Sequence, residues 1–524
     1  MGCLAAVNDD ILQNILSRLP ALSFAWAACV SKSWNKVCDR VLSRPKLVSA
    51  LSLNPSLPDA VKEVLEKVLS SPIRPQFAIA SIGLQFSLEE AHQLITEKLG
   101  SRTPVITNAT FGIIGRDALT NTMKEVRWNF DPEEDNSNSQ GSDAASNFNR
   151  GIVLIVGFLP GLKVDTIPLL RPKREPRFTM IDKFMMDIRD YTASVSGCIA
   201  PAGIILFGDQ HTDMTPVLAE IDCAMPEETV IVGDASSRFL FRSGGNSQSS
   251  ITDLYYFDAV ALVFAGDKDK PHGIGETRFH VTLSTGVMPF GPELRAVSVT
   301  SKGSECSWLT ACMNGYDEIL DSQRLLDDIS DEMDDESTDL YIGVIQKRPS
   351  SIEPEKLELR TYLAFYEVLG GDEEYLVVDG VGIRPGDTFL FYHSDSDTAS
   401  SSCLNAFENL KVLKAASSSK TRYSIRDVAA AGGGGDGNGE VFGCLMFSCH
   451  YRGESYFDSF PFYSNFPGAP LAGVVCNKEI GRDSTGSSTS MWQQAKGESP
   501  ARCSLHVCTT VYLVLSFVPP SPDH

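Results

Sequence analysis

The chain has 524 residues, 43% of them hydrophobic and 21% charged, with a formal net charge of −22. This composition excludes a fibrous or wholly disordered chain, and the length predicts roughly three globular domains. The acidic balance also argues against a nucleic-acid partner, because phosphate contacts need clustered Lys and Arg.

Cysteine usage and hydropathy predict an intracellular setting. The thirteen cysteines are odd in number and scattered, unlike those of a secreted disulfide scaffold. Asn8–Asp10 interrupt any N-terminal apolar run, and the late apolar stretch Leu505–Val518 is too short to span a bilayer. We therefore expect a cytoplasmic or nuclear protein without membrane attachment.

The first forty-odd residues predict three short helices. Apolar side chains recur at four-residue spacing from Ile11 to Leu19, and Pro20 ends this pattern. Two further helical runs cover Phe24–Val30 and Ser33–Leu42. Such a small unit forms only a marginal core, so it needs a partner to cover its remaining apolar surface.

This N-terminal unit resembles an F-box. An Ile-Leu…Ile-Leu…Leu-Pro helix spans Asn8–Pro20, and a Val-x-Lys-x-Trp motif lies within Ala28–Val37. In the F-box family this surface docks the Skp1 adaptor, which links to a cullin scaffold. The resemblance implies an F-box over residues 1–47 and a helical linker over 48–75; the alternative is an unrelated three-helix cap. The expected adaptor contacts are Ile11, Leu12, Ile15, Leu16, Leu19, Pro20, Val30 and Trp34.

From Gln76 onward, predicted strands and helices alternate, which is typical of a mixed α/β or α+β fold with helical crossovers. Ser87–Glu90 has the Ser-x-x-Glu form of a capping box and predicts a helix to Leu99 that closes on Gly100. The other predicted helices are Phe178–Val195 and Pro216–Cys223, the latter capped by Thr215. The predicted strands are Phe77–Ile82, Val105–Ala109, Gly151–Val156, Gly203–Phe207 and Thr229–Val232.

Beyond about Asp253 the chain is richer in predicted strands, and no leucine-rich, kelch or propeller repeat recurs at a fixed period. Three polar insertions, at about 131–150, 415–440 and 482–502, predict disorder. The acidic segment Asp317–Asp339 predicts a solvated helix face with a charged tail. The predicted strands are Tyr255–Phe264, Thr277–Leu283, Leu340–Ile345, Leu359–Val368, Thr388–Tyr392, Val441–His450 and Leu505–Phe517.

Five motifs follow one another through the same region. Two come after predicted strands, and three are similar to the Gln-Gly-Cys-Arg-Pro-x-Gly, Cys-x-x-Arg-Gly and Leu-Ala-Gly-Phe…Glu-Ile-Gly elements of one family. The motifs are Thr107–Gly115, Ile231–Ala235, Ser284–Pro292, Phe447–Gly453 and Leu471–Gly481. Through them residues 76–518 resemble a FIST sensory domain, with an N-terminal-like part at 76–250 and a C-terminal-like part at 251–518.

The FIST resemblance implies a small-ligand site, with amino acids or related molecules as the presumed ligands. Arg452 would hold a carboxylate through its two-pronged donor face, and glycine backbone would let a ligand approach closely. Val287 and Met288 stand where the family has Cys and Arg, so one anion contact is missing. The region would otherwise be a protein-recognition surface. The implied contact residues are Gly112, Gly233, Asp234, Gly286, Pro289, Cys449, Arg452, Gly453 and Glu479.

No pattern predicts a catalytic residue, a metal site or a cofactor. Cys449 and His450 are strand neighbours whose side chains point to opposite faces, so they form no hydrogen-bonded dyad without a bulge. Together with Cys444 they also lack the paired spacing of a zinc site. Asp209–Asp213 follows a strand, but no nucleophile matches it, and we interpret it as a polar loop.

The preferred functional hypothesis is a non-catalytic substrate receptor of an SCF-type ubiquitin ligase. The F-box would fix the chain to the adaptor, and the FIST-like region would hold a protein target for ubiquitin-dependent degradation by proximity. Two alternatives stay open: a small-ligand sensor in signal transduction, and a thiol-dependent enzyme that uses Cys449 or the Asp209–Asp213 loop. The reactivity of the Cys449 thiol separates the enzyme from the receptor.

Overall fold

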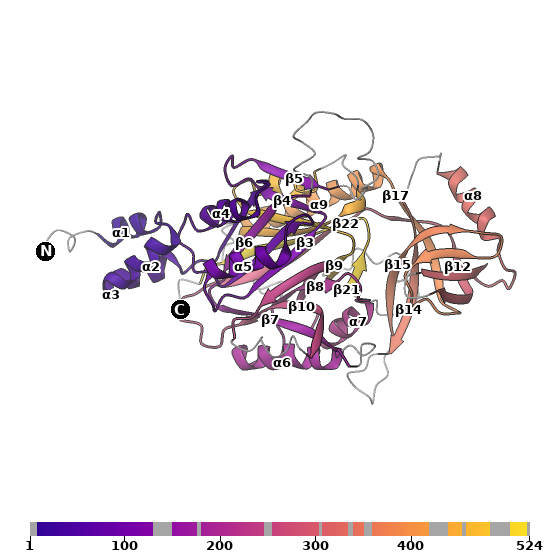
Figure 1. Cartoon of the computed structure of the whole chain (residues 1–524), viewed down its shortest axis with the longest axis horizontal. Coiled ribbons are helices and arrows are strands. Elements are labelled where there is room, and N and C mark those ends of the chain that lie inside the picture. Colours follow the sequence, from indigo (N-terminus) through magenta and orange to yellow (C-terminus); the bar gives the residue numbers. More distant parts are fainter. Residues whose placement is uncertain are drawn as a thin grey trace, which may run out of the picture.

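The computed structural model describes residues 8–128, 149–174, 180–245, 254–302, 306–333, 339–349, 359–418, 439–452, 457–482 and 503–520. Three parts follow one another along the long axis: a helical unit at the N-terminus, a central body of sheets and helices, and a β-barrel at the far end (Figure 1). The fold class is mixed helix and sheet, as predicted, but the barrel is not anticipated by the sequence patterns.

The N-terminal unit consists of α1 (Asp9–Leu16), α2 (Ala21–Val30) and α3 (Lys32–Val41). Asn8 accepts a hydrogen bond from the Asp10 N–H at the start of α1, and Ser31 accepts one from the Trp34 N–H at the start of α3. These caps satisfy helix-end donors that would otherwise be unpaired. The small core of the unit contains Leu12, Leu16, Phe24, Ala27, Val37 and Cys38.

The central body is built on two sheets. The strand order of the first is β1 (Lys46–Ser52), β6 (Ile152–Phe158), β2 (Phe77–Gly83), β3 (Val105–Thr110), β9 (Val230–Arg242), β8 (Gly203–Asp209), β10 (Tyr255–Gly266) and β7 (Leu162–Pro172). In addition, β20 (Glu479–Arg482) pairs with β9, and β21 (Cys503–His506) pairs with β20. The order of the second is β11 (Glu276–Thr285), β22 (Thr509–Val518), β18 (Glu440–Cys449), β19 (Leu471–Cys476), β4 (Gly112–Arg116) and β5 (Met123–Arg127).

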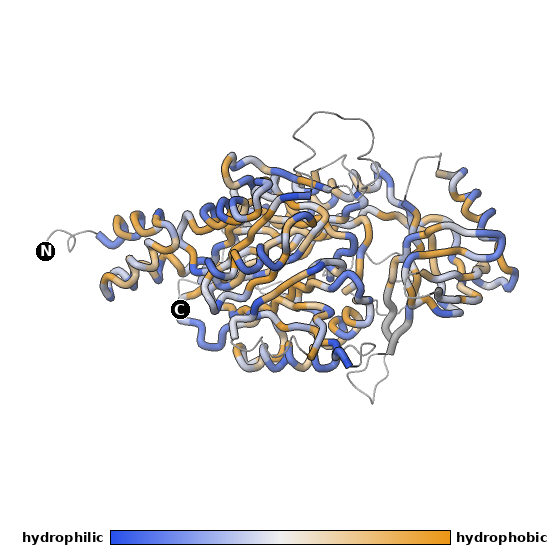
Figure 2. Tube along the Cα trace, viewed as in Figure 1, coloured by the Kyte–Doolittle hydropathy of each residue, from blue (hydrophilic) through white to orange (hydrophobic). Residues whose placement is uncertain are grey.

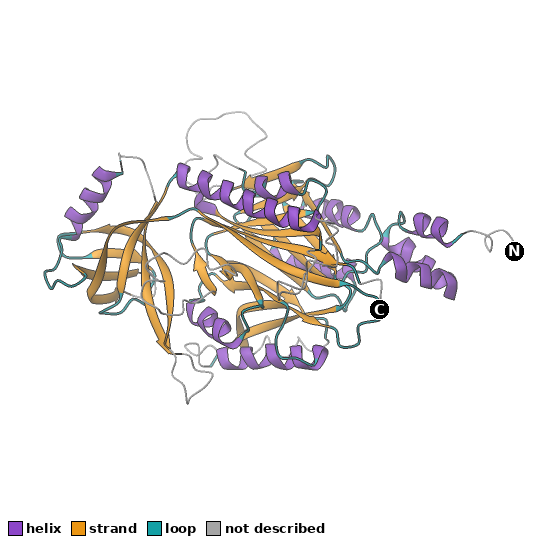
Figure 3. Cartoon of the chain, turned by 180° about the vertical axis from the view of Figure 1, so that it is seen from behind, coloured by secondary structure: helices purple, strands orange, loops and turns teal. Residues whose placement is uncertain are grey.

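The sheets pack face to face, and helices cover their outer faces, which gives four layers. On the first sheet lie α4 (Leu57–Val68), α5 (Leu88–Leu99), α6 (Ile181–Ser196) and α7 (Thr215–Ala224). On the second lie α9 (Ser396–Ser418) and α10 (Phe460–Asn465), which follows the short 3-10 helix η3 (His450–Arg452). Figure 3 shows the helices that cover the second sheet, seen from behind.

Apolar side chains cover both faces of the first sheet, because successive residues of a strand point to opposite faces. In β2, Phe77 and Ile79 point to the second sheet, whereas Ala78, Ala80 and Ile82 point to the helices. A strand that is buried on both faces needs apolar residues at every position, which explains the continuous runs in the sequence. The same runs form hydrophobic bands through the middle of the molecule in Figure 2.

The barrel is a separate closed sheet inserted between β11 and α9. Its strand order is β12 (Met288–Lys302), β13 (Cys306–Met313), β16 (Leu376–Asp379), β15 (Leu359–Gly371), β14 (Asp339–Pro349) and β17 (Thr388–Ser394). Helix α8 (Ser322–Glu332) packs its apolar residues on the barrel core, so the acidic segment contains a helix, as predicted.

Several local predictions are confirmed. Ser87 accepts a hydrogen bond from the Glu90 N–H at the start of α5, and Gly100 ends this helix with a φ of +81°. The strands predicted at Phe77–Ile82 and Val105–Ala109 correspond to β2 and β3. At α7 the prediction is wrong in detail: Thr215 is the first helical residue, and the Asp213 side chain accepts from its N–H.

Residues 48–75 are not a linker, contrary to expectation. Strand β1 pairs with β6 at the edge of the first sheet, and α4 buries its apolar face on the same sheet. Every residue from Lys46 to Ser52 pairs with a residue of β6. This segment is therefore part of the sheet and completes its core.

The expected division at residue 250 also does not describe the sheets. Strand β10, from the second half, lies between β7 and β8, and β4 and β5, from the first half, extend the second sheet. The strand predicted at Leu505–Phe517 is interrupted by a turn at Cys508, which has a φ of +47°.

The three insertions predicted to be disordered lie almost entirely outside the described residues. Their margins differ from the prediction. The predicted start of the second insertion is Ala415, but helix α9 extends to Ser418. The predicted start of the third is Arg482, which is the last residue of strand β20.

Truncation tests the role of residues 48–75. Removal of residues 1–45 is expected to leave the remainder folded, because the helical unit has its own core. Removal of residues 1–75 is expected to give insoluble protein, since burial of each large apolar side chain of α4 contributes roughly 1.5–3 kcal/mol and whole domains are stable by only about 5–15 kcal/mol. Solubility and thermal unfolding followed by circular dichroism measure this; equal melting of both fragments would contradict it.

Candidate functional site

Exposed apolar side chains recur along two helices of the N-terminal unit. Ile11 and Ile15 are 56% and 51% exposed, at four-residue spacing on α1. Leu22, Trp26 and Val30 are at least 63% exposed, at the same spacing on α2. We call these five residues the apolar stripe. Side chains of this size are rarely left in water without a partner when they occur together.

Only part of the predicted adaptor set lies in this stripe. Ile11, Ile15 and Val30 are exposed as expected, and Pro20 is also exposed. Leu12 and Leu16 belong to the core of the unit, and Leu19 and Trp34 pack against that core half-buried. Sequence reasoning did not single out Leu22 and Trp26, because α2 is apolar on all sides and its pattern does not identify the exposed face.

Arg452 occupies a buried polar network in the central body. Its Nε donates to Asp458 at 3.1 Å, and Nη1 donates to the carbonyls of Ser284 and Cys508 at 2.7 and 2.8 Å. Nη2 donates to the Ser284 hydroxyl at 2.9 Å, with Ala399 O and Ser402 Oγ at 3.4 Å. All five N–H donors of the guanidinium therefore have protein acceptors, and none remains for a ligand carboxylate. These contacts favour a structural role.

Three of the four implied glycines mark close packing of the chain on itself. A Cβ on Gly112 would lie 2.3 Å from the Val126 carbonyl oxygen, and one on Gly233 would lie 1.9 Å from that of Leu206. At Gly286 it would lie 2.4 Å from the Cys508 carbonyl oxygen. Neighbouring backbone of the same chain, rather than a ligand, occupies the space at these positions.

The remaining implied residues are dispersed. Pro289 is exposed at the start of barrel strand β12, opposite Tyr392 of β17. Gly453 lies outside the described residues. Cys449 ends β18 in the core, and burial raises the pKa of its thiol well above the ordinary value. A buried thiol with a raised pKa is a poor nucleophile, which argues against the thiol-dependent enzyme.

Asp234 and Glu479 form a buried pair of carboxyl groups. They are directly opposite in the antiparallel pairing of β9 and β20, and they are 1% and 0% exposed. Burial raises the pKa of Asp234 to about 7, although hydrogen bonds from Ser236 offset part of this effect. Burial likewise raises the pKa of Glu479 well above its ordinary value. Its Oε1 lies 3.6 Å from the Cys476 sulfur, and its Oε2 has no hydrogen-bond partner among the described residues.

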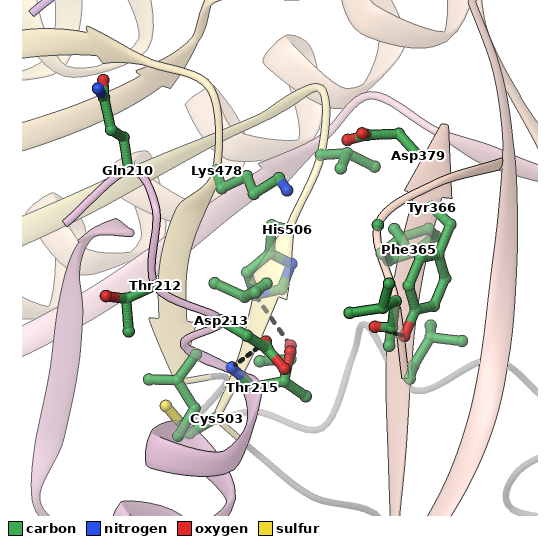
Figure 4. A pocket seen from close by; sticks show the side chains of 18 of the residues that line it. Gln210, Thr212, Asp213, Thr215, Phe365, Tyr366, Asp379, Lys478, Cys503 and His506 are labelled. Carbon is green, nitrogen blue, oxygen red and sulfur yellow. Dashed lines mark hydrogen bonds between the residues drawn. The ribbon is translucent and has the colours of Figure 1, made fainter. Parts of the chain in front are cut away.

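A cavity of about 360 Å³ opens between the central body and the barrel (Figure 4). The loop Gln210–Asp213 and strand β21 form one wall, and Leu363–Tyr366 of β15 with Asp379–Val381 forms the other. Lys478 points into this space from the turn between β19 and β20. Its ammonium has no hydrogen bond or ion pair with the part of the chain that the structure describes.

The Asp209–Asp213 loop has local structural partners, as expected for a polar loop. The Asp209 carboxylate accepts from the His211 N–H, and the Asp213 carboxylate accepts from the Thr215 N–H. Within the described ranges no group of three or more His, Cys, Asp or Glu side chains is arranged to hold a metal ion. None of the described helices is long and apolar enough to cross a membrane.

Comparison with known proteins identifies the N-terminal unit and a relative of the whole chain. The model of the F-box domain matches residues 7–46. A protein of Arabidopsis thaliana named F-box/LRR-repeat protein is 40% identical over 529 residues, which cover 98% of this chain and 94% of that protein. Leucine-rich repeats stack strand-containing units into a horseshoe, whereas the described strands of this chain form two packed sheets and a closed barrel.

Substitution of Arg452 tests its structural role. Arg452→Ala removes one of the two cations that pair with the buried Asp458 carboxylate, together with the donors to the Ser284 and Cys508 carbonyls, so we expect a loss of about 3–5 kcal/mol in the free energy of unfolding. The free energy of unfolding of Arg452→Lys should lie between those of the parent and Arg452→Ala, because an ammonium has three donors where the guanidinium has five. Urea unfolding measures both; the exposed control Arg44→Ala should change stability by less than about 0.5 kcal/mol. A fully stable Arg452→Ala protein would contradict the structural role.

The Asp234 carboxyl predicts a pH dependence of stability. Because its folded pKa is about 7 and its ordinary value is 3.8, the native state retains a proton that the unfolded chain releases between these values. The free energy of unfolding therefore falls as pH rises from 4 to 7. Asp234→Asn should reduce the dependence of the free energy of unfolding on pH and stabilise the protein at pH 7.5 by up to about 4 kcal/mol. Part of the dependence should remain, because the pKa of Glu479 is also raised. Urea unfolding at pH 4 and 7.5, with exposed Glu66→Gln as control, measures the effect.

Proposed function

The chain belongs to the F-box protein family, and from this premise we propose that it selects a protein target for an SCF-type ubiquitin ligase through its central body and barrel. F-box domains bind Skp1 within SCF complexes, and F-box proteins are generally non-catalytic subunits of them. A receptor of this kind acts by holding its target near a carrier protein that is loaded with ubiquitin. It would do so in the cytoplasm or the nucleus, where the adaptor and the cullin are present.

The apolar stripe is the observation that carries the adaptor assignment. Aliphatic and aromatic surface is exposed on α1 and α2 at Ile11, Ile15, Leu22, Trp26 and Val30. A partner groove that covers these side chains removes this surface from water. Trp26 is 66% exposed, and a large aromatic side chain of this kind is a frequent energetic centre of an interface. The adaptor residues proposed from the structure are therefore the stripe, with Pro20 beside it.

The target module would comprise all of the chain after the F-box. The barrel lies at the opposite end of the molecule from the N-terminal unit, so its surface stays accessible when the F-box is occupied (Figure 1). The resemblance of residues 76–518 to FIST sensory domains supports a recognition role for the central body and barrel together.

A small-ligand sensor is the second candidate. The cavity supports it, because about 360 Å³ is within the range of small-molecule pockets and Lys478 would attract an anionic group. In that case the ligand would not contact Arg452, whose donors are occupied by the protein. Ligand binding would alter target choice only if the ligand binds one state of the receptor more tightly than another.

Charge substitution in the stripe tests the adaptor assignment. Ile11→Asp with Ile15→Asp places two carboxylates in an apolar interface, so co-purification with a Skp1-type adaptor should fall at least a hundredfold. Because both side chains are exposed, the melting temperature should change little. Leu119→Asp, at an exposed site distant in sequence, is the matched control and should bind normally. Leu16→Asp should instead unfold the unit, because Leu16 is 1% exposed. Undiminished adaptor binding by the double variant would refute the assignment.

A further inference from the structure

Strand β21 has an open backbone edge that faces the cavity. Among the described strands, β21 pairs only with β20, and β20 pairs on its other side with β9. The Ala235 N–H donates to the Lys478 carbonyl, so Lys478 and Ile480 direct their backbone groups to β9. Glu479 and Gly481, at the alternate positions, therefore face β21.

The same alternation fixes the direction of the β21 backbone. Ser504 and His506 are opposite Gly481 and Glu479, so their backbone groups face β20, whereas those of Leu505 face away. The Cys503 N–H confirms this pattern, because it donates to the Asp222 carboxylate at 3.1 Å and not to β20. Leu505 thus directs one N–H and one C=O toward the cavity.

The opposite wall is also a strand edge. Leu363–Phe365 of β15 pairs with β14 on one side, and the pairing of β15 with β16 begins only at Val368. Both β15 and β21 contribute residues to the cavity lining. The space therefore has extended backbone on two sides and the Lys478 ammonium at its rim (Figure 4).

We propose that this cavity binds an extended segment of a partner protein, which adds as a strand to the open edge of β21. The segment pairs its backbone with the N–H and C=O of Leu505 and carries an acidic side chain toward Lys478. Four residues of β21 span about 13 Å at roughly 3.3 Å per residue, so the paired core of the segment is short. Main-chain pairing supplies affinity in this mode, and side-chain contacts supply specificity.

Backbone chemistry favours a peptide over a compact small molecule. A small molecule that displaces water from the β21 edge leaves the Leu505 N–H and C=O unpaired unless it carries matching groups. An extended peptide satisfies both groups at once, and its alternate side chains reach either Phe365 on the barrel wall or Lys478. This inference rests on the proposed receptor function and identifies the kind of target segment that it recognises.

The test uses the full chain in complex with a Skp1-type adaptor. Random linear octapeptides displayed on phage are selected on the complex, and the enriched peptides are synthesised and measured by fluorescence polarisation. Single N-methylation along each peptide is expected to weaken binding at least tenfold at the residue that pairs with Leu505 and less than twofold at the residues on either side of it. A uniform effect of N-methylation, or no peptide enriched over background, would overturn strand addition.

Variants of the chain give an independent reading of the same peptides. Leu505→Pro removes an N–H that makes no bond to β20, so binding should fall at least tenfold with little change in melting temperature. Leu505→Ala keeps the N–H and should bind within threefold of the parent. Lys478→Glu should shift the enriched peptides from acidic to basic. If Leu505→Pro does not fold, the N-methylation series on the parent chain still decides the question.

Adaptor capture separates this inference from the proposed function. Leu505→Pro should retain the adaptor, and the Ile11→Asp, Ile15→Asp chain should retain the peptides. Peptide binding without adaptor capture by the parent chain would remove the ligase function and leave strand addition in place. Adaptor capture with unchanged peptide affinity in Leu505→Pro and Lys478→Glu would remove strand addition alone.

Discussion

The buried network of Arg127, Asp458 and Arg452 joins the segments that build the second sheet. Asp458 accepts from both guanidinium groups, and its side chain and that of Arg452 are fully buried. Glu125, 3.6 Å from Arg127, brings a second carboxylate, so two cations and two anions lie together. Ions removed from water are tolerated in a core only when each is paired and hydrogen-bonded. Here the partners come from β5, η3, β11 and the β21–β22 turn, so the network forms only when distant parts of the chain have assembled.

This dependence explains why the central body folds as one unit. Strand β10 crosses from the second half of the chain into the first sheet, and β4 and β5 cross in the other direction. Between the sheets, side chains from both halves form a single apolar core. A boundary drawn near residue 250 would cut through that core, and each separated half would expose it to water.

Local sequence signals predicted much of the fold but little of the candidate site. The Ser87 capping box, the apolar run of β2 and the helical face of α1 are encoded within a few residues, and the structure has them where they are expected. Strand β1 and the barrel depend on pairing between residues far apart in the sequence, which periodicity does not report. The sequence suggested Arg452 as a carboxylate ligand for the same reason, because most of its acceptors, on Ser284, Ala399 and Cys508, lie far away in the sequence. The cavity arises only where barrel and body meet.

The junction between F-box and body bears directly on how such a receptor works. Helix α3 ends at Val41 and strand β1 begins at Lys46, so four residues connect the adaptor-binding unit to a strand of the first sheet. The Ala21 N–H also donates to the Leu69 carbonyl beyond α4, which adds a second contact across the junction. A flexible linker would let the target sample many positions, whereas a short double connection restricts them. Because transfer by proximity depends on the distance between a bound segment and the ubiquitin carrier, this restriction would confine modification to target lysines within a limited range of the cavity.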